Sequence, residues 1–158
     1  MPKLYLSIIF LFNVLGSNAQ STYHSGKIND ANLKFIKENY NWGIEPVVII
    51  NFLQPKSNCH YDAYTNFKAS NSWWTEFYSE INLEGVAIRY VYSDKNAAKK
   101  IIDDIFHLAD NDNFFLKAFF SNEKFCHGVI VINQSGEFEQ KSSEYTAEDI
   151  TNFLKILN

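Results

Sequence analysis

The chain has 158 residues, with 18 Asp and Glu against 14 Lys and Arg, so its formal net charge is −4 at pH 7. This acidic balance excludes a generally basic surface of the kind that binds nucleic acid or anionic lipid. Aromatic residues make up 16% of the sequence, while Gly and Pro number only 6 and 3, which excludes a disordered chain and predicts one folded domain.

The N-terminus has the three parts of a secretory signal peptide. Lys3 supplies positive charge, an apolar run covers residues 4–15, and small residues lead up to Ala19. The run falls short of the roughly 20 apolar residues that a membrane-spanning helix needs. We therefore expect a signal peptide over residues 1–19 that is cleaved after Ala19, no stable membrane anchor afterwards, and a periplasmic or secreted protein.

After cleavage, we expect a flexible polar leader over residues 20–28 and a single domain over residues 29–158. Asn29 can cap a first helix that ends near Trp42. Residues 47–53 are nearly all apolar and many are β-branched, which predicts a central strand that is covered on both faces of a sheet.

A polar turn over residues 54–60 leads into residues 61–80, which lack Gly and Pro and predict a long helix. Ser57 or Asn58 would cap this helix. A second apolar, β-branched strand is expected over residues 85–92.

The next segment predicts a third helix, which Ser93 and Asp94 would open. Its apolar residues recur at helical spacing: Ala97, Ile101, Ile102, Ile105 and Leu108. Residues 110–113 form a turn cluster, whereas the apolar segment 114–120 fits either a short helix or a strand.

The C-terminal part predicts a hairpin and a last helix. Residues 129–133 and 137–141 would be its strands, joined by a tight turn over residues 134–136. A helix over residues 147–157 follows, with Thr146 as its cap. This order of helices and strands predicts an α/β protein, a three-layer α/β/α sandwich with a mixed central sheet.

Three stretches of sequence carry a family resemblance: residues 48–53 before the turn that holds Cys59, residues 85–94, and residues 129–138. Together with the element order, they resemble the thioredoxin-like superfamily, in particular its extracytoplasmic TlpA/ResA-like (redoxin) branch. The resemblance covers roughly residues 45–157 and implies a thioredoxin-like sandwich.

Two positions depart from this family. Its redox motif is Cys-x-x-Cys after the first central strand, whereas this turn offers one cysteine, Cys59, with Ser57 and His60 beside it. The family also has a cis-proline before the strand that begins near residue 129. His127 stands at that position here, directly after Cys126.

The resemblance implies that the loop with Cys126 packs against the turn with Cys59, within bridging distance. One hypothesis is that Cys59 and Cys126 form a catalytic pair for thiol-disulfide exchange with exported or envelope proteins, without a cofactor. Cys59 would attack as a thiolate stabilised at a helix N-terminus, and Ser57, His60 and His127 would support the pair.

Two alternatives stay open from the sequence. The cysteines can form a structural disulfide in a thioredoxin-fold binding module that has no catalytic activity. Alternatively, the pairs Cys59-His60 and Cys126-His127 can bind Zn²⁺ or Cu⁺, which favour thiolate and imidazole ligands, although adjacent side chains diverge in regular structure.

The remaining aromatic and histidine residues are expected to have structural positions. Of Trp73 and Trp74, one should lie in the core and the other should be partly exposed. His24 and His107 are expected at the surface or at a helix end.

Overall fold

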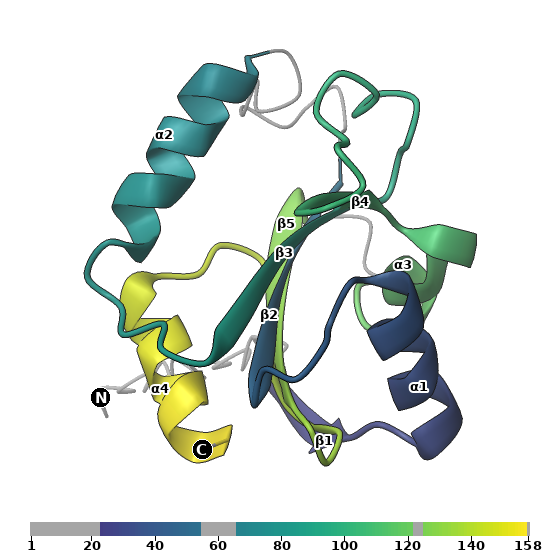
Figure 1. The fold of residues 1–158 in the computed structure, drawn as a ribbon, viewed down its shortest axis with the longest axis vertical. Coiled ribbons are helices and arrows are strands. Elements are labelled where there is room, and N and C mark those ends of the chain that lie inside the picture. The colour runs from purple at the N-terminus through teal and green to yellow at the C-terminus, as the bar shows by residue number, and fades with distance from the viewer. Residues whose placement is uncertain (1–22, 55–65, 122–124, 158) are drawn as a thin grey trace, which may run out of the picture.

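A computed structural model describes residues 23–54, 66–121 and 125–157 (Figure 1). The predicted signal peptide, Ser57, Cys59 and His60 lie outside the described residues. The helices are α1 (Asp30–Asn39), α2 (Phe67–Tyr78), α3 (Phe114–Ala118), which follows a 3₁₀ turn (Asn111–Asn113), and α4 (Ala147–Leu157). The strands are β1 (Tyr23–Lys27), β2 (Val47–Leu53), β3 (Val86–Tyr92), β4 (His107–Ala109), β5 (His127–Asn133) and β6 (Glu137–Ser142).

The strands form one mixed sheet in the order β1-β6-β5-β2-β3-β4. Strand β2 runs parallel to β3 and antiparallel to β5, with Leu53 opposite His127 at its end. Helices α1 and α3 lie on one face of the sheet and α2 and α4 on the other (Figure 1). This arrangement confirms the predicted three-layer α/β/α sandwich.

Strand β2 is the centre of the fold because all seven of its residues are buried. Val48, Ile50 and Phe52 enter the core beneath α1 and α3. Val47 and Ile49 enter the second core, beneath α2 and α4. The continuous apolar run is therefore explained by helices on both faces, as predicted.

The predicted flexible leader is wrong for residues 23–27, which form the edge strand β1. These residues pair antiparallel with β6, from Tyr23 opposite Lys141 to Lys27 opposite Glu137. All five are exposed, so the segment shows no apolar alternation, and its strand conformation depends on backbone pairing with a distant part of the chain.

The predicted helix after β3 is also wrong. Residues 95–101 form turns, and Leu108 lies in β4, which pairs parallel with β3. The Asp103 carboxylate accepts hydrogen bonds from the backbone N–H groups of Ile105, Phe106 and His107 at 2.8–2.9 Å. Asp104 has a positive φ of 59°. These contacts turn the chain back towards β3, where it forms sheet hydrogen bonds instead of a helix.

The helix after β2 begins later than predicted. Helix α2 starts at Phe67, and Asn66 is its cap, whose side chain accepts from the N–H of Ala69 at 3.1 Å. Ser57 and Asn58 are therefore not the cap of α2. Residues 114–120, which fitted either a short helix or a strand, contain the short helix α3. Its Phe115 and Leu116 N–H groups donate to the Asp110 carboxylate, each at 2.9 Å.

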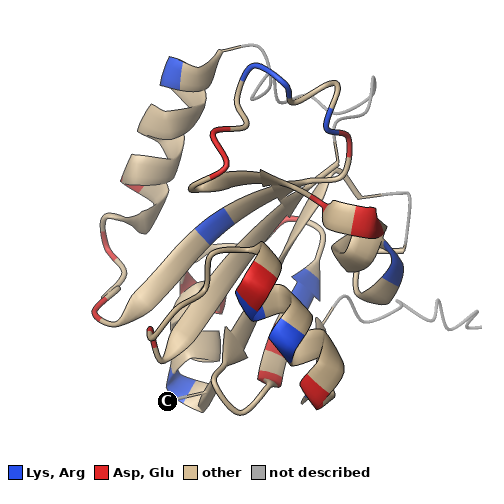
Figure 2. Cartoon of the chain, turned by 45° about the vertical axis from the view of Figure 1, so that its right-hand side comes forward, with Lys and Arg blue, Asp and Glu red and all other residues tan. Residues whose placement is uncertain are grey.

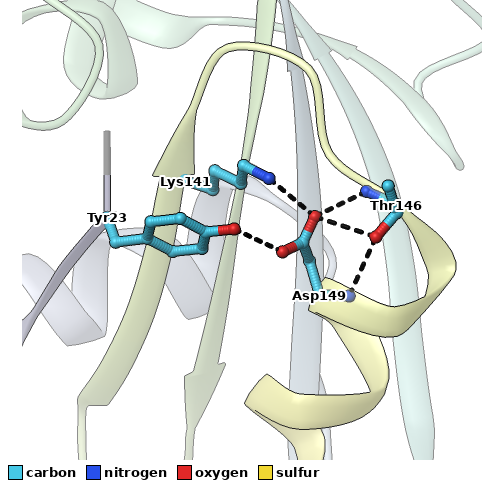
Figure 3. Close-up of polar contacts among 4 residues, drawn as sticks. All are labelled: Tyr23, Lys141, Thr146 and Asp149. Atoms are coloured by element: carbon cyan, nitrogen blue, oxygen red, sulfur yellow. Dashed lines mark hydrogen bonds and ion pairs between the residues drawn. The ribbon is translucent and has the colours of Figure 1, made fainter. Parts of the chain in front are cut away.

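Helix α4 begins with the predicted capping box, and the same carboxylate also ties down β1 (Figure 3). Asp149 accepts from the Thr146 N–H at 2.7 Å, from Lys141 Nζ at 2.8 Å and from the Tyr23 hydroxyl at 2.6 Å. Burial alone would raise the pKa of Asp149, but the hydrogen bonds from Lys141, Tyr23 and Thr146 hold that pKa at about 2.

We expect Asp149→Asn to lower the free energy of unfolding by about 2 kcal/mol at pH 7, because the charged carboxylate is stabilised only in the folded state. The folded pKa lies below the ordinary value of 3.8. The stabilisation is therefore present above about pH 4, and it is lost as the pH falls towards 2.

Urea unfolding from pH 2 to pH 7 measures this difference. Glu148→Gln removes the neighbouring exposed carboxylate and should change the unfolding free energy by no more than about 0.5 kcal/mol. A deficit of Asp149→Asn that is the same at pH 2 and pH 7 would contradict the assignment.

Candidate active site

Cys126 lies beside the C-terminal end of β2. Its carbonyl accepts a hydrogen bond of 2.7 Å from the backbone N–H of Gln54, the last described residue before the segment that contains Cys59. Cys126 is partly exposed and is disulfide-bonded. The structure thus places Cys126 in the loop before β5, next to the end of β2.

A layer of aromatic rings supports this loop from the α3 side of the sheet. Phe120 stacks on Phe52, with ring centroids 4.6 Å apart and an interplanar angle of 6°. A Cβ atom on Gly128 would lie 2.5 Å from the Phe120 ring. Only glycine therefore leaves room for the ring next to the start of β5, close to Cys126.

His127 begins β5 and is half-buried on the opposite face of the sheet. Its carbonyl accepts from the Ser143 N–H at 3.1 Å, and its ring lies edge-on to Tyr145, with centroids 5.9 Å apart. Burial lowers the pKa of His127, while the nearby Glu144 carboxylate opposes that change. The imidazole is therefore neutral at pH 7 and can accept a proton.

A buried polar centre lies on the same face as His127. The amide oxygen of Asn51 accepts from the hydroxyls of Tyr78 and Tyr145, each at 2.7 Å, and its Nδ2 donates to the Arg89 carbonyl at 3.3 Å. Asn51 is completely buried. It therefore joins β2, α2 and the segment that precedes α4, and burial raises the pKa of both tyrosines.

The sequence reasoning missed this centre, although a signal was available. Asn51 is the single polar residue in the run Val47–Leu53. A buried amide must find hydrogen-bond partners, and the tyrosines of α2 and of the segment before α4 are candidates for that role.

The sequence predicts His107 at the surface or at a helix end, and this prediction is wrong. His107 lies buried in β4. Its Nδ1 is 2.9 Å from the Tyr92 hydroxyl, and its ring stacks on Tyr90 with centroids 4.7 Å apart. Burial lowers the pKa of His107, opposed by the Asp103 carboxylate. His107 thus serves the packing beneath α2.

The expected helix N-terminus at Cys59 is not provided by α2, which begins at Phe67. The macrodipole of that helix therefore cannot be used to argue for a thiolate at Cys59. Within the described ranges, no group of three or more His, Cys, Asp or Glu side chains is arranged to hold a metal ion. In the same residues, no helix has the length and apolar character needed to cross a membrane.

The fold is thioredoxin-like, since a parallel β2–α2–β3 unit is joined in one sheet by the antiparallel hairpin β5–β6 and a final helix. The sequence matches no protein-family model and no curated protein sequence.

Several solved structures are similar to the chain at low sequence identity. StoA from Bacillus subtilis has a TM-score of 0.48 and 15% identity, over 72% of this chain and 86% of that chain. A DsbF homologue from Corynebacterium diphtheriae has a TM-score of 0.48 and 11% identity, over 89% and 96% respectively. The exposed lipoprotein thioredoxin Etrx1 from Streptococcus pneumoniae strain TIGR4 has a TM-score of 0.47 and 15% identity, over 84% and 99%.

Proposed function

We propose that this protein is exported and exchanges disulfides with other exported proteins through Cys59 and Cys126. The observation that carries the proposal is the disulfide at Cys126, because Cys59 is the only other cysteine of the chain. The hydrogen bond between Gln54 and Cys126 supports this pairing, since the segment with Cys59 begins directly after Gln54. A disulfide also agrees with an oxidising compartment.

Oxidation of a partner proceeds through two thiolate attacks. A partner thiolate attacks one sulfur of the Cys59–Cys126 disulfide, so a mixed disulfide forms as that bond breaks. A second partner thiolate then attacks the mixed disulfide, which leaves an oxidised partner and two reduced cysteines. Two electrons pass to the pair, and the two protons released by the partner thiols are taken up by its thiolates. In the reverse direction, the Cys59 thiolate attacks a partner disulfide.

The surroundings of Cys126 suit such an exchange. The residue is partly exposed, so a partner sulfur can approach it. The neutral imidazole of His127 follows it directly in the chain and can take a proton from an attacking thiol. We also propose that Ser57 and His60 support Cys59.

We expect the reduced protein to cleave a disulfide-linked fluorescent reporter at least tenfold faster than free cysteine at the same concentration, because the second thiol resolves the mixed disulfide within the same molecule. Cys126→Ser should stop turnover and accumulate one reporter per chain on Cys59, detected by mass. Cys59→Ser should also abolish turnover, without an accumulated adduct.

A wild-type rate no higher than that of free cysteine would refute catalysis and favour the structural disulfide of a binding module. The metal content of the same reduced sample separates the remaining alternative. One equivalent of Zn²⁺ or Cu⁺ per chain that is lost in Cys59→Ser would assign the pair to metal binding instead.

A further inference from the structure

Strand β1 forms one edge of the sheet, and its outer side presents backbone groups that β6 does not use (Figure 1). The N–H of Ile28 donates to the carbonyl of Gly136 at 2.8 Å, which sets the phase of the antiparallel pairing between β1 and β6. With this phase and the observed register, the N–H and C=O groups of Ser25 and Lys27 point away from β6. Backbone groups in this position can pair with a further strand.

The opposite edge of the sheet is closed by its own chain. In β4, the carbonyl of His107 accepts from the N–H groups of Asp103 and Asp104 at 3.1 and 3.2 Å, and the His107 N–H donates to the Asp103 carboxylate at 2.9 Å. A short edge strand that is covered by a turn resists pairing with another chain. Among the described residues, no such turn bonds the outer backbone groups of Ser25 and Lys27, so β1 is the edge that can accept a partner.

Gly26, in the middle of β1, gives this edge a centre that is free of side-chain bulk. A Cβ atom on Gly26 would lie 3.1 Å from the ring of Phe138, its neighbour on β6, so the ring already fills that space. If two copies of β1 pair antiparallel about a two-fold axis at Gly26, Ser25 of one copy lies opposite Lys27 of the other. Both residues have outward backbone groups, so these groups satisfy one another in a self-complementary interface.

A carboxylate without a cation lies next to this edge. Glu139 is the neighbour of Ser25 on β6 and is partly buried. It points to the α4 side of the sheet, because it is two residues from Lys141, whose Nζ bonds Asp149 of α4. Within the described ranges, neither Glu139 nor Lys27 forms an ion pair. Burial raises the pKa of Glu139, so a cation beside it would stabilise its charged form.

The two-fold axis at Gly26 supplies that cation from a second copy. Lys27 of the second copy would lie two strand spacings, about 10 Å, from Glu139, across the short side chain of Ser25. A lysine and a glutamate side chain together cover this span. A register shifted by two residues would instead place Lys27 opposite Tyr23, whose neighbour on β6 is Lys141, another cation. Charge complementarity therefore favours the register centred on Gly26.

We propose that two copies of this chain associate through antiparallel pairing of β1 about a two-fold axis at Gly26, with Lys27 of each copy bound to Glu139 of the other. The two sheets then form one continuous sheet. Figure 2 shows acidic and basic residues interspersed along the described elements, so no large field of one sign opposes the approach. The paired segment is short, so the dimer forms reversibly and is weak.

Sedimentation of the purified full chain at increasing concentration tests this proposal. We expect monomers at about 1 µM and mostly dimers at about 1 mM. Lys27→Glu alone and Glu139→Lys alone should each stay monomeric, because each brings like charges together across the axis. An equimolar mixture of these two variants should dimerise again, since both contacts of the mixed pair then join opposite charges. Recovery in the mixture also shows that both variants are folded.

Lys68→Glu is the matched control, because it makes the same charge change at an exposed position of α2, away from β1 (Figure 1). This variant should dimerise as the wild type does. In the concentrated wild-type sample, hydrogen exchange at the amides of Ser25 and Lys27 should slow, since both become bonded. A chain that stays monomeric at about 1 mM, single variants that dimerise normally, or a mixture that does not dimerise would overturn the proposal.

The exposed ring of Trp73 on α2 offers another surface to a second copy. Trp73 is 49% exposed, whereas Trp74 is buried, which confirms that one tryptophan lies in the core and the other is partly exposed. A dimer that Trp73→Ala abolishes and that Lys27→Glu leaves intact would place the interface on α2 and overturn the pairing of β1.

Discussion

Replacing Asn51 with leucine is expected to lower the free energy of unfolding by about 4 kcal/mol. Leucine branches at Cγ as asparagine does and is the larger of the two side chains, so the substitution leaves no cavity in the core. It offers no acceptor to the hydroxyls of Tyr78 and Tyr145, which both donate to Asn51 at 2.7 Å. Each polar group that loses its partner in a buried site costs about 1–3 kcal/mol, and urea unfolding at pH 7 measures the total.

A triple variant provides the matched control. Asn51→Leu combined with Tyr78→Phe and Tyr145→Phe removes the acceptor and both donors, so most of the loss should be recovered. A loss below about 1 kcal/mol for Asn51→Leu would show that the amide is not a structural centre. A triple variant no more stable than Asn51→Leu would show that the loss arises from packing rather than from unpaired hydroxyls.

The elements that the sequence predicts correctly are determined by residues close together in the chain. Strand β2 has a continuous apolar run, the hairpin β5–β6 has its Gln134 to Gly136 turn, and α4 has a capping box in which Thr146 and Asp149 exchange hydrogen bonds. Neighbouring residues determine these structures, so the pattern alone is sufficient.

The wrong elements depend on contacts between distant residues. The apolar spacing from Ala97 to Leu108 fits a helix, but pairing of β4 with β3 overrides that preference, and local hydrogen bonds to Asp103 shape the turn that leads into β4. Strand β1 is entirely exposed, and only its pairing with β6 makes it a strand. In both cases the decisive partner is remote in sequence.

The candidate site was predictable in part. The family resemblance led to Cys126 and His127, and the structure places both at the end of β2, next to Gln54 and Leu53. The buried amide of Asn51 was not predicted as a hydrogen-bonding centre, because its partners Tyr78 and Tyr145 reach it only when β2, α2 and the segment before α4 come together.

We propose that Cys59 and Cys126 form a pair that turns over between disulfide and dithiol. We expect its reduction potential to lie at about −270 to −120 mV, the range of proteins that exchange disulfides with partners. Partial exposure of Cys126 agrees with such a value, because exposed disulfides have higher, more oxidising potentials than structural bridges.

The most direct test is to equilibrate the full chain in thiol-disulfide buffers of known potential, block the free thiols and measure the oxidised fraction by mass, with peptide mapping of the bridge. A Cys59–Cys126 disulfide that is half reduced between about −270 and −120 mV is the predicted result. A bridge that stays oxidised below about −300 mV would contradict the account and identify a structural disulfide.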